Sequence, residues 1–170
     1  PEQDVLERLT GGRASMRQIT DSLGALAVMH RCGLLHFPRI DRSLATMAAA
    51  RKYGPFAGAV HAHATRGLDA TAISDERGGV TYIELDAASN ALVRAWISDG
   101  VTPGSIVGVM ARNHRGLVLT MVAAAKLDAR LVMMNTGFAP RQLVEVAARE
   151  QVSAFVFDSE FAAVAAALPA

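Results

Sequence analysis

The 170-residue sequence has a single cysteine, few aromatic residues (5%) and no long apolar run. Because Cys32 has no second cysteine to pair with, an intrachain disulfide is excluded, which fits a reducing, cytoplasmic environment. The longest apolar stretches, such as residues 117–125, fall well short of the roughly 20 residues that a membrane-spanning helix needs. We therefore expect a cytoplasmic protein, whose only membrane contact would be peripheral.

An excess of charge of either sign is also missing. The 17 Lys and Arg residues balance 16 Asp and Glu residues, giving a net charge of +1. A chain without a strongly basic balance gives no reason to expect nucleic acid as a partner. With 51% hydrophobic and 19% charged residues, the chain has the composition of a folded globular protein rather than a disordered one.

Several common functional motifs are absent. The loop "ARNHRG" after the first expected parallel strand has one glycine, so it is no G-x-G-x-x-G dinucleotide fingerprint. The sequence has no Gly-Lys pair for a P-loop and no G-x-S-x-G nucleophile elbow. His61 and His63 are two apart, so on a helix they would point in different directions. Cys32 and His36 have a better spacing, but Gly33 and Pro38 argue against a helix there. We therefore assign no catalytic residue and no metal site, and we expect Asp75 and Glu76 to be solvated on a turn.

Residues 1–67 show a helical pattern. Apolar residues recur at steps of three and four from Met16 to Ala27, which predicts one amphipathic helix. A second helix is expected from Asp41 or Ser43 to Tyr53, where Gly54-Pro55 ends it, and a third from Phe56 to Arg66. We interpret this segment as a helical N-terminal extension.

From residue 68 to residue 170, the spacing of apolar residues differs from the helical spacing of residues 1–67. A two-stranded ribbon is expected over 70–74 and 80–81, with Gly78-Gly79 in its turn. Thr81 and Glu84 form a capping box that begins a helix running to Asp99. This helix should bury one face, formed by Leu85, Ala88, Leu92 and Trp96. Gly100 fits the left-handed position after a helix, and Pro103-Gly104 fits the centre of a type II turn.

Strands and helices then alternate. Strands are predicted over 105–110, 130–134 and 152–157, with helices over 114–127, 140–150 and 161–168. Asn113 is the expected cap of the first of these helices and Pro140 the first residue of the second. The core should include Trp96 and both methionines of "VMMN". The predicted fold class is α/β: a partial parallel βαβαβ sheet layered with helices and preceded by a helical extension.

The loop "NTGFAP" follows the second parallel strand. Ligands bind at the carboxyl ends of the strands in such sheets. Gly137 in this loop either permits a turn or lets a ligand approach the backbone closely.

Several segments, in this order, resemble the N-terminal part of adenylate-forming enzymes: "TYIELDAASNAL", "GVTPGSIVGVM", "RN", "AAAKLDA" and "F-x-P-x-x-L" after "NTG". This family includes acyl-CoA synthetases, luciferases and the adenylation domains of peptide synthetases. The resemblance covers about residues 79–158. The segment with "GLLHFPR" and the "ARNHRG" loop are most similar to actinobacterial fatty-acid–CoA ligases.

The resemblance implies a two-step reaction that uses ATP, Mg²⁺ and coenzyme A. A fatty acid is first converted to an acyl-adenylate, and CoA then displaces AMP to form a thioester. The family's signature loop, its adenine, ribose and Mg²⁺ ligands and its C-terminal lysine have no counterpart in this sequence. We therefore expect residues 68–170 to be the first part of a truncated domain, inactive alone and binding no cofactor strongly.

In CoA-forming relatives the loop that matches "NTGFAP" lines the pantetheine channel. The resemblance thus implies a CoA site at Asn135, Thr136 and Gly137. One alternative is a fatty acyl-AMP ligase, which stops at the adenylate. Another is a non-catalytic module that binds a partner or a membrane through residues 13–31, where arginines flank the apolar stripe. The sequence leaves acyl chain length open and is compatible with a homo-oligomer.

Overall fold

The computed structural model describes residues 16–31, 40–67 and 69–169. The chain divides into two compact units, Pro1–Leu44 and Ala45–Ala170. The first unit contains α2 (Met16–Arg31), which confirms the predicted helix, and the first residues of α3 (Ile40–Ala64). Cys32 and His36 lie outside the described residues. The predicted boundary between a helical N-terminal extension, residues 1–67, and the domain that follows it stays a prediction.

Helix α3 is broken where the sequence predicted a break. Gly54 has a left-handed φ of 76° with ψ of 168°, and Pro55 begins a second helical run. Proline is suited to this position because the first N–H groups of a helix have no partner within it. The two runs pack closely within the second unit. A Cβ atom on Gly58 would lie 2.5 Å from Ala50 Cα.

The predicted ribbon is an antiparallel hairpin of β1 (Thr71–Asp75) and β2 (Gly78–Thr81). The turn differs slightly from the prediction, because Glu76 and Arg77 occupy it and both glycines belong to β2. Gly78 has a φ of 99°, so a left-handed residue directly follows the turn.

The capping box at the start of α4 (Tyr82–Ser98) is confirmed. Thr81 N–H donates to Glu84 Oε2 at 2.8 Å, and Glu84 N–H donates to Thr81 Oγ1 at 3.2 Å. The predicted signals after the helix are also confirmed. Gly100 and Gly104 have φ of 88° and 84°, and Ser105 N–H donates to the carbonyl of Thr102 at 3.0 Å.

The buried face of α4 needs one correction. Leu85 and Trp96 are buried as predicted, but Ala88 is exposed and the hydroxyl-bearing Ser89 is fully buried instead. A polar residue on the apolar stripe requires a buried hydrogen-bond partner. The Ser89 hydroxyl donates to the carbonyl of Asp86 at 2.9 Å and accepts from Lys126, which is described below.

A parallel three-stranded sheet confirms the predicted α/β class. Its strands are β3 (Ile106–Met110), β4 (Arg130–Met133) and β5 (Ala154–Phe157), in the order β4-β3-β5. Helix α5 (Arg115–Leu127) connects β3 to β4, and α6 (Pro140–Arg149) connects β4 to β5. The chain ends in a short 3-10 helix, η1 (Ser159–Phe161), and α7 (Ala162–Ala165).

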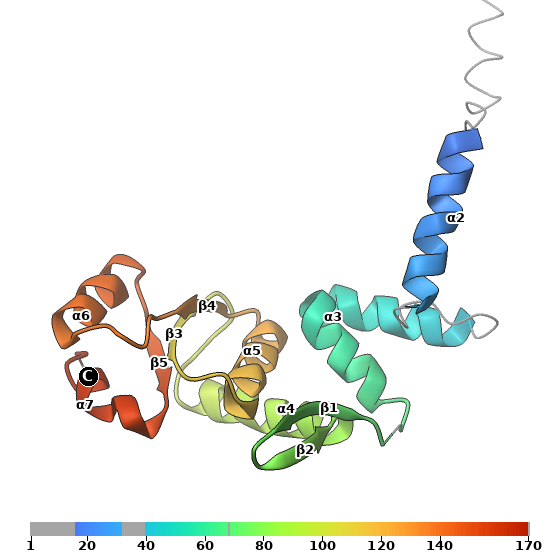
Figure 1. Ribbon diagram of the computed structural model, residues 1–170. Coiled ribbons are helices and arrows are strands. Elements are labelled where there is room, and N and C mark those ends of the chain that lie inside the picture. The colour runs from blue at the N-terminus through green and yellow to red at the C-terminus, as the bar shows by residue number, and fades with distance from the viewer. Residues whose placement is uncertain (1–15, 32–39, 68, 170) are drawn as a thin grey trace, which may run out of the picture. The chain divides into compact units, whose positions relative to one another are not determined.

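Helices cover both faces of this sheet (Figure 1). Because side chains alternate along a strand, Val107 and Val109 pack towards α4 and α5, while Met110 packs towards α6 and α7. Gly108 allows Phe155 to approach, since a Cβ atom there would lie 2.6 Å from the phenyl ring. One prediction fails at the edge strand β4, where Met133 is 54% exposed although Met134 is buried. No helix in the described part of the chain is both long and apolar enough to cross a membrane.

Candidate functional site

Three loops follow the carboxyl ends of the parallel strands, where α/β sheets bind ligands. The predicted loop with Asn135, Thr136 and Gly137 follows the edge strand β4. The loop with Arg112 and His114 follows the central strand β3. Residues 158–160 follow β5. The sequence prediction included only the first of these loops.

The Asn135–Gly137 loop is an Asn-stabilised turn. Asn135 Oδ1 accepts a hydrogen bond from Gly137 N–H at 2.8 Å, and Phe138 N–H donates to the carbonyl of Asn135 at 3.0 Å. Asn135 and Gly137 are exposed, and Thr136 is half-buried. The φ of Gly137 lies outside the left-handed region, and a Cβ atom there would meet only Asn135 Oδ1, at 3.3 Å. The turn itself therefore does not require glycine at this position.

Ion pairs join the loops after β3 and β5. Arg112 binds Glu160 through two hydrogen bonds of 3.0 and 2.8 Å, and its backbone N–H donates to Asp158 Oδ2 at 2.7 Å. His114 Nε2 lies 2.8 Å from Asp158 Oδ1, and its Nδ1 accepts from Gly116 N–H at 2.9 Å. Because Nδ1 is an acceptor, Nε2 carries the hydrogen that His114 donates to Asp158. Both nitrogens are engaged, so His114 is not available as a general base.

The position of His114 corrects the predicted helix cap. His114, not Asn113, is the N-cap of α5, and Asn113 is exposed. The hydrogen bond that His114 Nε2 donates to Asp158 fixes the imidazole so that Nδ1 faces the backbone N–H groups of the first helical turn. Burial alone would raise the pKa of Asp158, but the bonds from Arg112 N–H and His114 outweigh burial and lower it.

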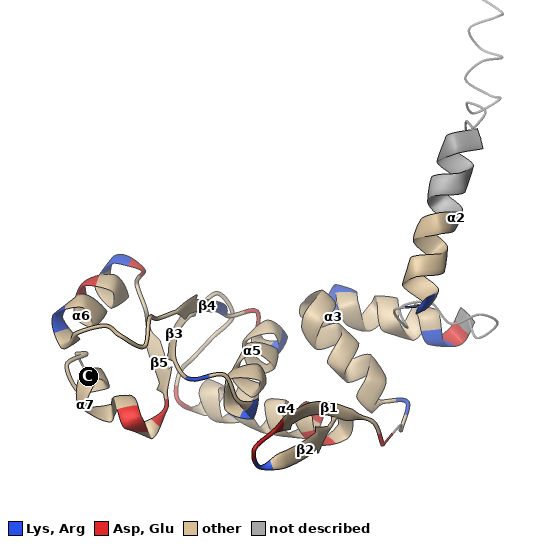
Figure 2. Ribbon diagram, viewed as in Figure 1, with Lys and Arg blue, Asp and Glu red and all other residues tan. Residues whose placement is uncertain are grey.

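Arg115 ties the hairpin to α5. Its Nε donates to Asp75 Oδ2 at 2.8 Å, a second guanidinium nitrogen donates to Asp75 Oδ1, and the same group reaches the Gly78 carbonyl at 2.9 Å. These bonds lower the pKa of the Asp75 carboxyl strongly. The expectation of a solvated Asp75 is therefore wrong, since its side chain is only 8% exposed. Acidic and basic residues adjoin at this turn in Figure 2.

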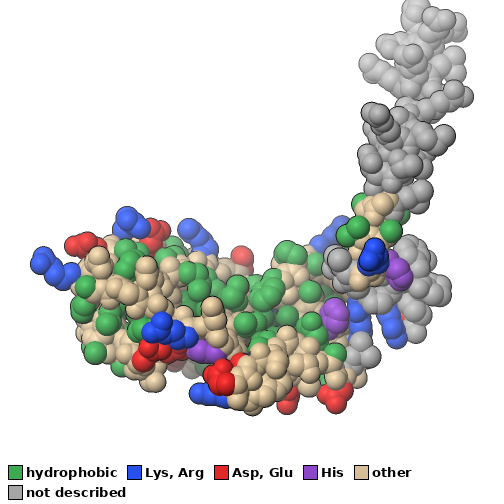
Figure 3. Space-filling view, in the orientation of Figure 1, with side chains coloured by type: hydrophobic (Ala, Val, Ile, Leu, Met, Phe, Trp, Pro, Cys, Tyr) green, Lys and Arg blue, Asp and Glu red, His purple; other side chains and the backbone are tan. Residues whose placement is uncertain are grey.

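These charged side chains line a surface hollow of about 510 Å³. Basic, acidic and histidine side chains gather on this face in Figure 3. Most of the charges neutralise one another in pairs, so the hollow offers no free carboxylate–histidine pair for proton transfer. The arrangement ties together the loops after β3 and β5 and connects the hairpin to α5.

A second polar network, missed from the sequence, lies between α4 and α5. The Lys126 side chain is 3% exposed, and its Nζ donates to Asp86 Oδ1, Ser89 Oγ and Asn90 Oδ1, each at 2.8 Å. His61 Nδ1 of α3 lies 3.2 Å from Asp86 Oδ1. Burial opposes ionisation of Asp86, but Lys126 and His61 together lower its pKa. The i, i+3, i+4 spacing of the three acceptors was a readable signal, because these positions share one face of a helix.

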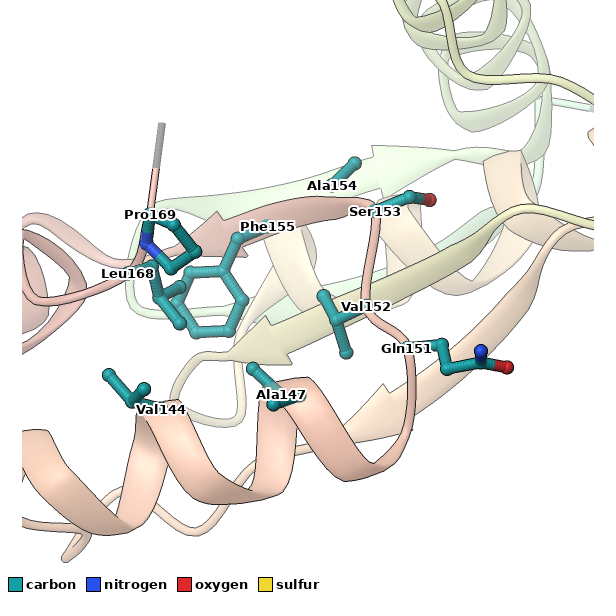
Figure 4. Close-up of a pocket in the computed structure, with 10 residues that line it drawn as sticks. Val144, Ala147, Gln151, Val152, Ser153, Ala154, Phe155, Leu168 and Pro169 are labelled. Carbon is teal, nitrogen blue, oxygen red and sulfur yellow. The ribbon is translucent and has the colours of Figure 1, made fainter.

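An apolar hollow of about 290 Å³ lies between α6, β5 and the end of the chain. In Figure 4 the side chains of Val144, Ala147, Phe155 and Leu168 point into it, and Gln151 points away. The hollow has no titratable side chain in its lining, so it offers space for apolar groups but no chemistry of its own.

The described residues do not fit a metal ion. They contain no group of three or more His, Cys, Asp or Glu side chains arranged to hold one. His61 instead bonds Asp86, and His63 stacks on Tyr82 with ring centroids 4.7 Å apart.

The parallel sheet with its helical layers defines the class, an α/β domain. The family model described as AMP-binding enzyme matches residues 60–170, and the chain belongs to this family. Tyrocidine synthase 3 of Brevibacillus parabrevis is 30% identical over 84 residues, 49% of this chain and 1% of that protein. The medium/long-chain-fatty-acid–CoA ligase FadD6 of Mycobacterium tuberculosis is 38% identical over 56 residues, 33% of this chain and 9% of that protein.

Among solved structures, the N-terminal domain of FACL13 from Mycobacterium tuberculosis has the same fold. The TM-score is 0.62 at 20% identity, covering 66% of this chain and 29% of that one. The chain thus spans less than a tenth of the curated relatives named above and under a third of this structure.

Proposed function

We propose that this chain is part of an ATP-dependent fatty-acid–CoA ligase. In this reaction the fatty-acid carboxylate attacks the α-phosphorus of ATP, forming an acyl-adenylate and releasing pyrophosphate. The thiol of CoA then attacks the acyl carbonyl, and AMP leaves as the thioester forms. The observation that carries the proposal is the 38% identity to a fatty-acid–CoA ligase within a chain of the AMP-binding family.

The chain's own contribution to the proposed site is the Asn135–Gly137 loop. It lies at the carboxyl edge of the sheet, it is largely exposed, and the turn has no need of glycine at position 137. Because glycine has no side chain, the backbone at position 137 would leave space for a narrow group such as the pantetheine arm. We assign no ATP or Mg²⁺ contact to the described residues, because none of their clusters suits a metal.

A second candidate is an amino-acid-activating domain of a peptide synthetase. It is supported by the similarity to tyrocidine synthase 3 and to nonribosomal peptide synthetase 13 of Aspergillus fumigatus, which is 28% identical over 98 residues. Both candidates form an adenylate, but they differ in the acid that they activate. A fatty acyl-AMP ligase would activate the same acid as the first candidate without forming a CoA thioester.

The test uses the intact protein that contains this chain. Pyrophosphate release and thioester formation are measured with fatty acids of several lengths and with the twenty amino acids, each with and without CoA. We expect fatty-acid-dependent pyrophosphate release and an acyl-CoA product detected by mass spectrometry. Activation of an amino acid would favour the second candidate, and adenylate without acyl-CoA would indicate an acyl-AMP ligase. Either result would overturn the proposal.

A further inference from the structure

His114 is bonded through both of its ring nitrogens to different parts of the chain. Its Nδ1 accepts a hydrogen bond from Gly116 N–H at 2.9 Å, and its Nε2 lies 2.8 Å from Asp158 Oδ1. The first bond caps helix α5, and the second reaches the loop after β5, 44 residues further along the chain. A single imidazole therefore ties the start of α5 to that loop.

Gly116 provides the space that this ring occupies. A Cβ atom at position 116 would lie 2.7 Å from Cε1 and 2.9 Å from Nδ1 of His114. The φ of Gly116 lies outside the left-handed region, so the backbone itself does not require glycine, which is disfavoured within helices. The glycine is explained by the close approach of the imidazole.

The two linked loops lie at the topological switch point of the sheet. In the strand order β4-β3-β5, the chain leaves β3 for α5 on one face of the sheet and leaves β5 for α7 on the other face. Adjacent loops diverge at such a point, and open α/β sheets bind ligands in the crevice between them. The hollow that is lined by His114 and Asp158 lies at this position.

Only a neutral imidazole can make both bonds. In the neutral ring one nitrogen accepts and the other donates, and histidine is the side chain that ordinarily gains a proton between pH 8 and pH 5. A proton from solvent would add to Nδ1, which would then point an N–H group at Gly116 N–H. It would also place a positive charge at the positive end of the α5 dipole. Protonation thus breaks the cap, whereas the bond to Asp158 remains.

The neighbouring charges are held in pairs of their own. Arg112 binds Glu160, and Arg115 binds Asp75. These bonds lower the pKa of both carboxyl groups; burial would raise the pKa of Asp158, but the hydrogen bonds that it accepts outweigh burial. The three carboxylates therefore stay ionised at pH 5. The charged groups that line the hollow around the ring are Asp75, Glu76, Arg77, Arg112, Arg115, Asp158 and Glu160.

We propose that His114 is a proton-sensitive latch between helix α5 and the loop after β5. At pH 8 the neutral ring caps the helix and holds the loop. At pH 5 the imidazolium keeps its bond to Asp158 and releases the first turn of α5, which loosens one wall of the crevice. This inference is independent of the reaction proposed above, because it rests on the hydrogen bonds of His114 alone.

The experiment is NMR spectroscopy of the 170-residue chain labelled with nitrogen-15. Two-bond correlation spectra show which nitrogen of each imidazole carries the hydrogen, and backbone spectra follow the Gly116 amide from pH 8 to pH 5. We expect His114 to carry its hydrogen on Nε2 at pH 8, and the Gly116 amide to shift as the ring gains its proton. The exchange protection of this amide, corrected for the intrinsic rate at each pH, should fall roughly fivefold, as for loss of a typical helix cap.

His114→Asn distinguishes proton sensitivity from packing, because asparagine caps a helix but does not titrate. In this variant the Gly116 amide should keep its protection at pH 5. His63→Asn is the matched control, since His63 stacks on Tyr82 and bonds the Ala59 carbonyl instead of a helix cap. It should leave the response of Gly116 to pH as it is in the parent chain.

Four results would overturn the proposal. They are a hydrogen on Nδ1 of His114 at pH 8, a ring that is still neutral at pH 5, a Gly116 amide that stays constant while the ring gains its proton, and an equal response in His114→Asn. The last result would assign the pH dependence of Gly116 to another group.

Discussion

At the scale of single residues, Gly137 has room for a side chain. Its backbone is not left-handed, and a Cβ atom would meet only Asn135 Oδ1, at 3.3 Å, so a shift of a few tenths of an ångström would accommodate it. We expect Gly137→Leu in the intact enzyme to leave adenylate formation intact and to slow thioester formation at least ~10-fold, about 1.4 kcal/mol in the barrier. Single-turnover assays of the two half-reactions measure this.

The control for Gly137→Leu is Ala87→Leu, which introduces the same leucine side chain at an exposed position on α4. The free energy of unfolding of both variants should lie within about 0.5 kcal/mol of that of the parent protein. If both half-reactions of Gly137→Leu fall together, or if neither changes, the assignment of the pantetheine channel to this loop is wrong.

Lys126 is a charged residue whose substitution should destabilise the fold, because its side chain is only 3% exposed. Its ammonium is buried against three side-chain acceptors of α4. Lys126→Met would leave Asp86 without its main counter-charge, and we expect a loss of roughly 3–5 kcal/mol in the free energy of unfolding. Urea denaturation measures this loss.

A double variant distinguishes the contribution of the ion pair to stability from the contribution of packing. Asp86→Leu combined with Lys126→Met removes both charges, so it should recover part of the loss. A double variant as unstable as the sum of its two single variants would show that the network acts through packing alone.

At the scale of elements, the hairpin depends on the ionised form of Asp75. The folded-state pKa of Asp75 lies below its unfolded value of about 3.9, so the bond to Arg115 contributes stability above that pH. This contribution is lost as the pH falls from about 5 towards 2. We expect Asp75→Asn to lower the melting temperature at pH 7 and to flatten its decline between pH 5 and 2.

Glu76→Gln is the matched control, because it removes the same charge from the neighbouring turn residue. It should leave the pH profile of the melting temperature unchanged. Identical profiles for the two variants would mean that net charge, rather than the bond to Arg115, governs the acid response.

A second prediction at this scale concerns the close packing of the two helical runs of α3. Gly58→Ala would force its new Cβ atom against the Ala50 backbone and separate the two helical runs. We expect a loss of about 1–3 kcal/mol, as for other overpacked sites. The same substitution at Gly24 of α2 meets no atom within 4 Å, so it should be neutral or stabilising. Calorimetry measures the stability of the two variants. Equal stability of Gly58→Ala and Gly24→Ala would contradict the close packing at Gly58.

At the scale of the whole molecule, the three-stranded parallel sheet has helices on both faces, and the described residues contain no group of side chains arranged to hold a metal ion. We expect the 170-residue chain alone to show no carboxylate-dependent exchange of pyrophosphate into ATP. The intact protein, assayed under the same conditions, is the positive control. Exchange above the blank by the isolated chain would show that nucleotide binding resides within these residues.

The sequence by itself determined the local features of the fold and the family. The Thr81–Glu84 capping box, the turn at Pro103-Gly104 and the start of α6 at Pro140 were all predicted correctly. Each depends on hydrogen bonds or backbone preferences within about four residues, so a short window of sequence contains the whole cause. The alternation of short apolar runs with helical patterns predicted the α/β class for the same reason, because each pattern lies within one element.

Only the tertiary structure decided which distant groups meet. Arg115 lies 40 residues from Asp75, His114 lies 44 from Asp158, and Lys126 lies 40 from Asp86. The polarity of a residue gives no indication of a partner so far along the chain, so the sequence placed Asp75 in solvent and Asn113 at the helix cap. Folding brings these groups into partly buried positions, where an unpaired charge is costly, and this cost fixes the pairs.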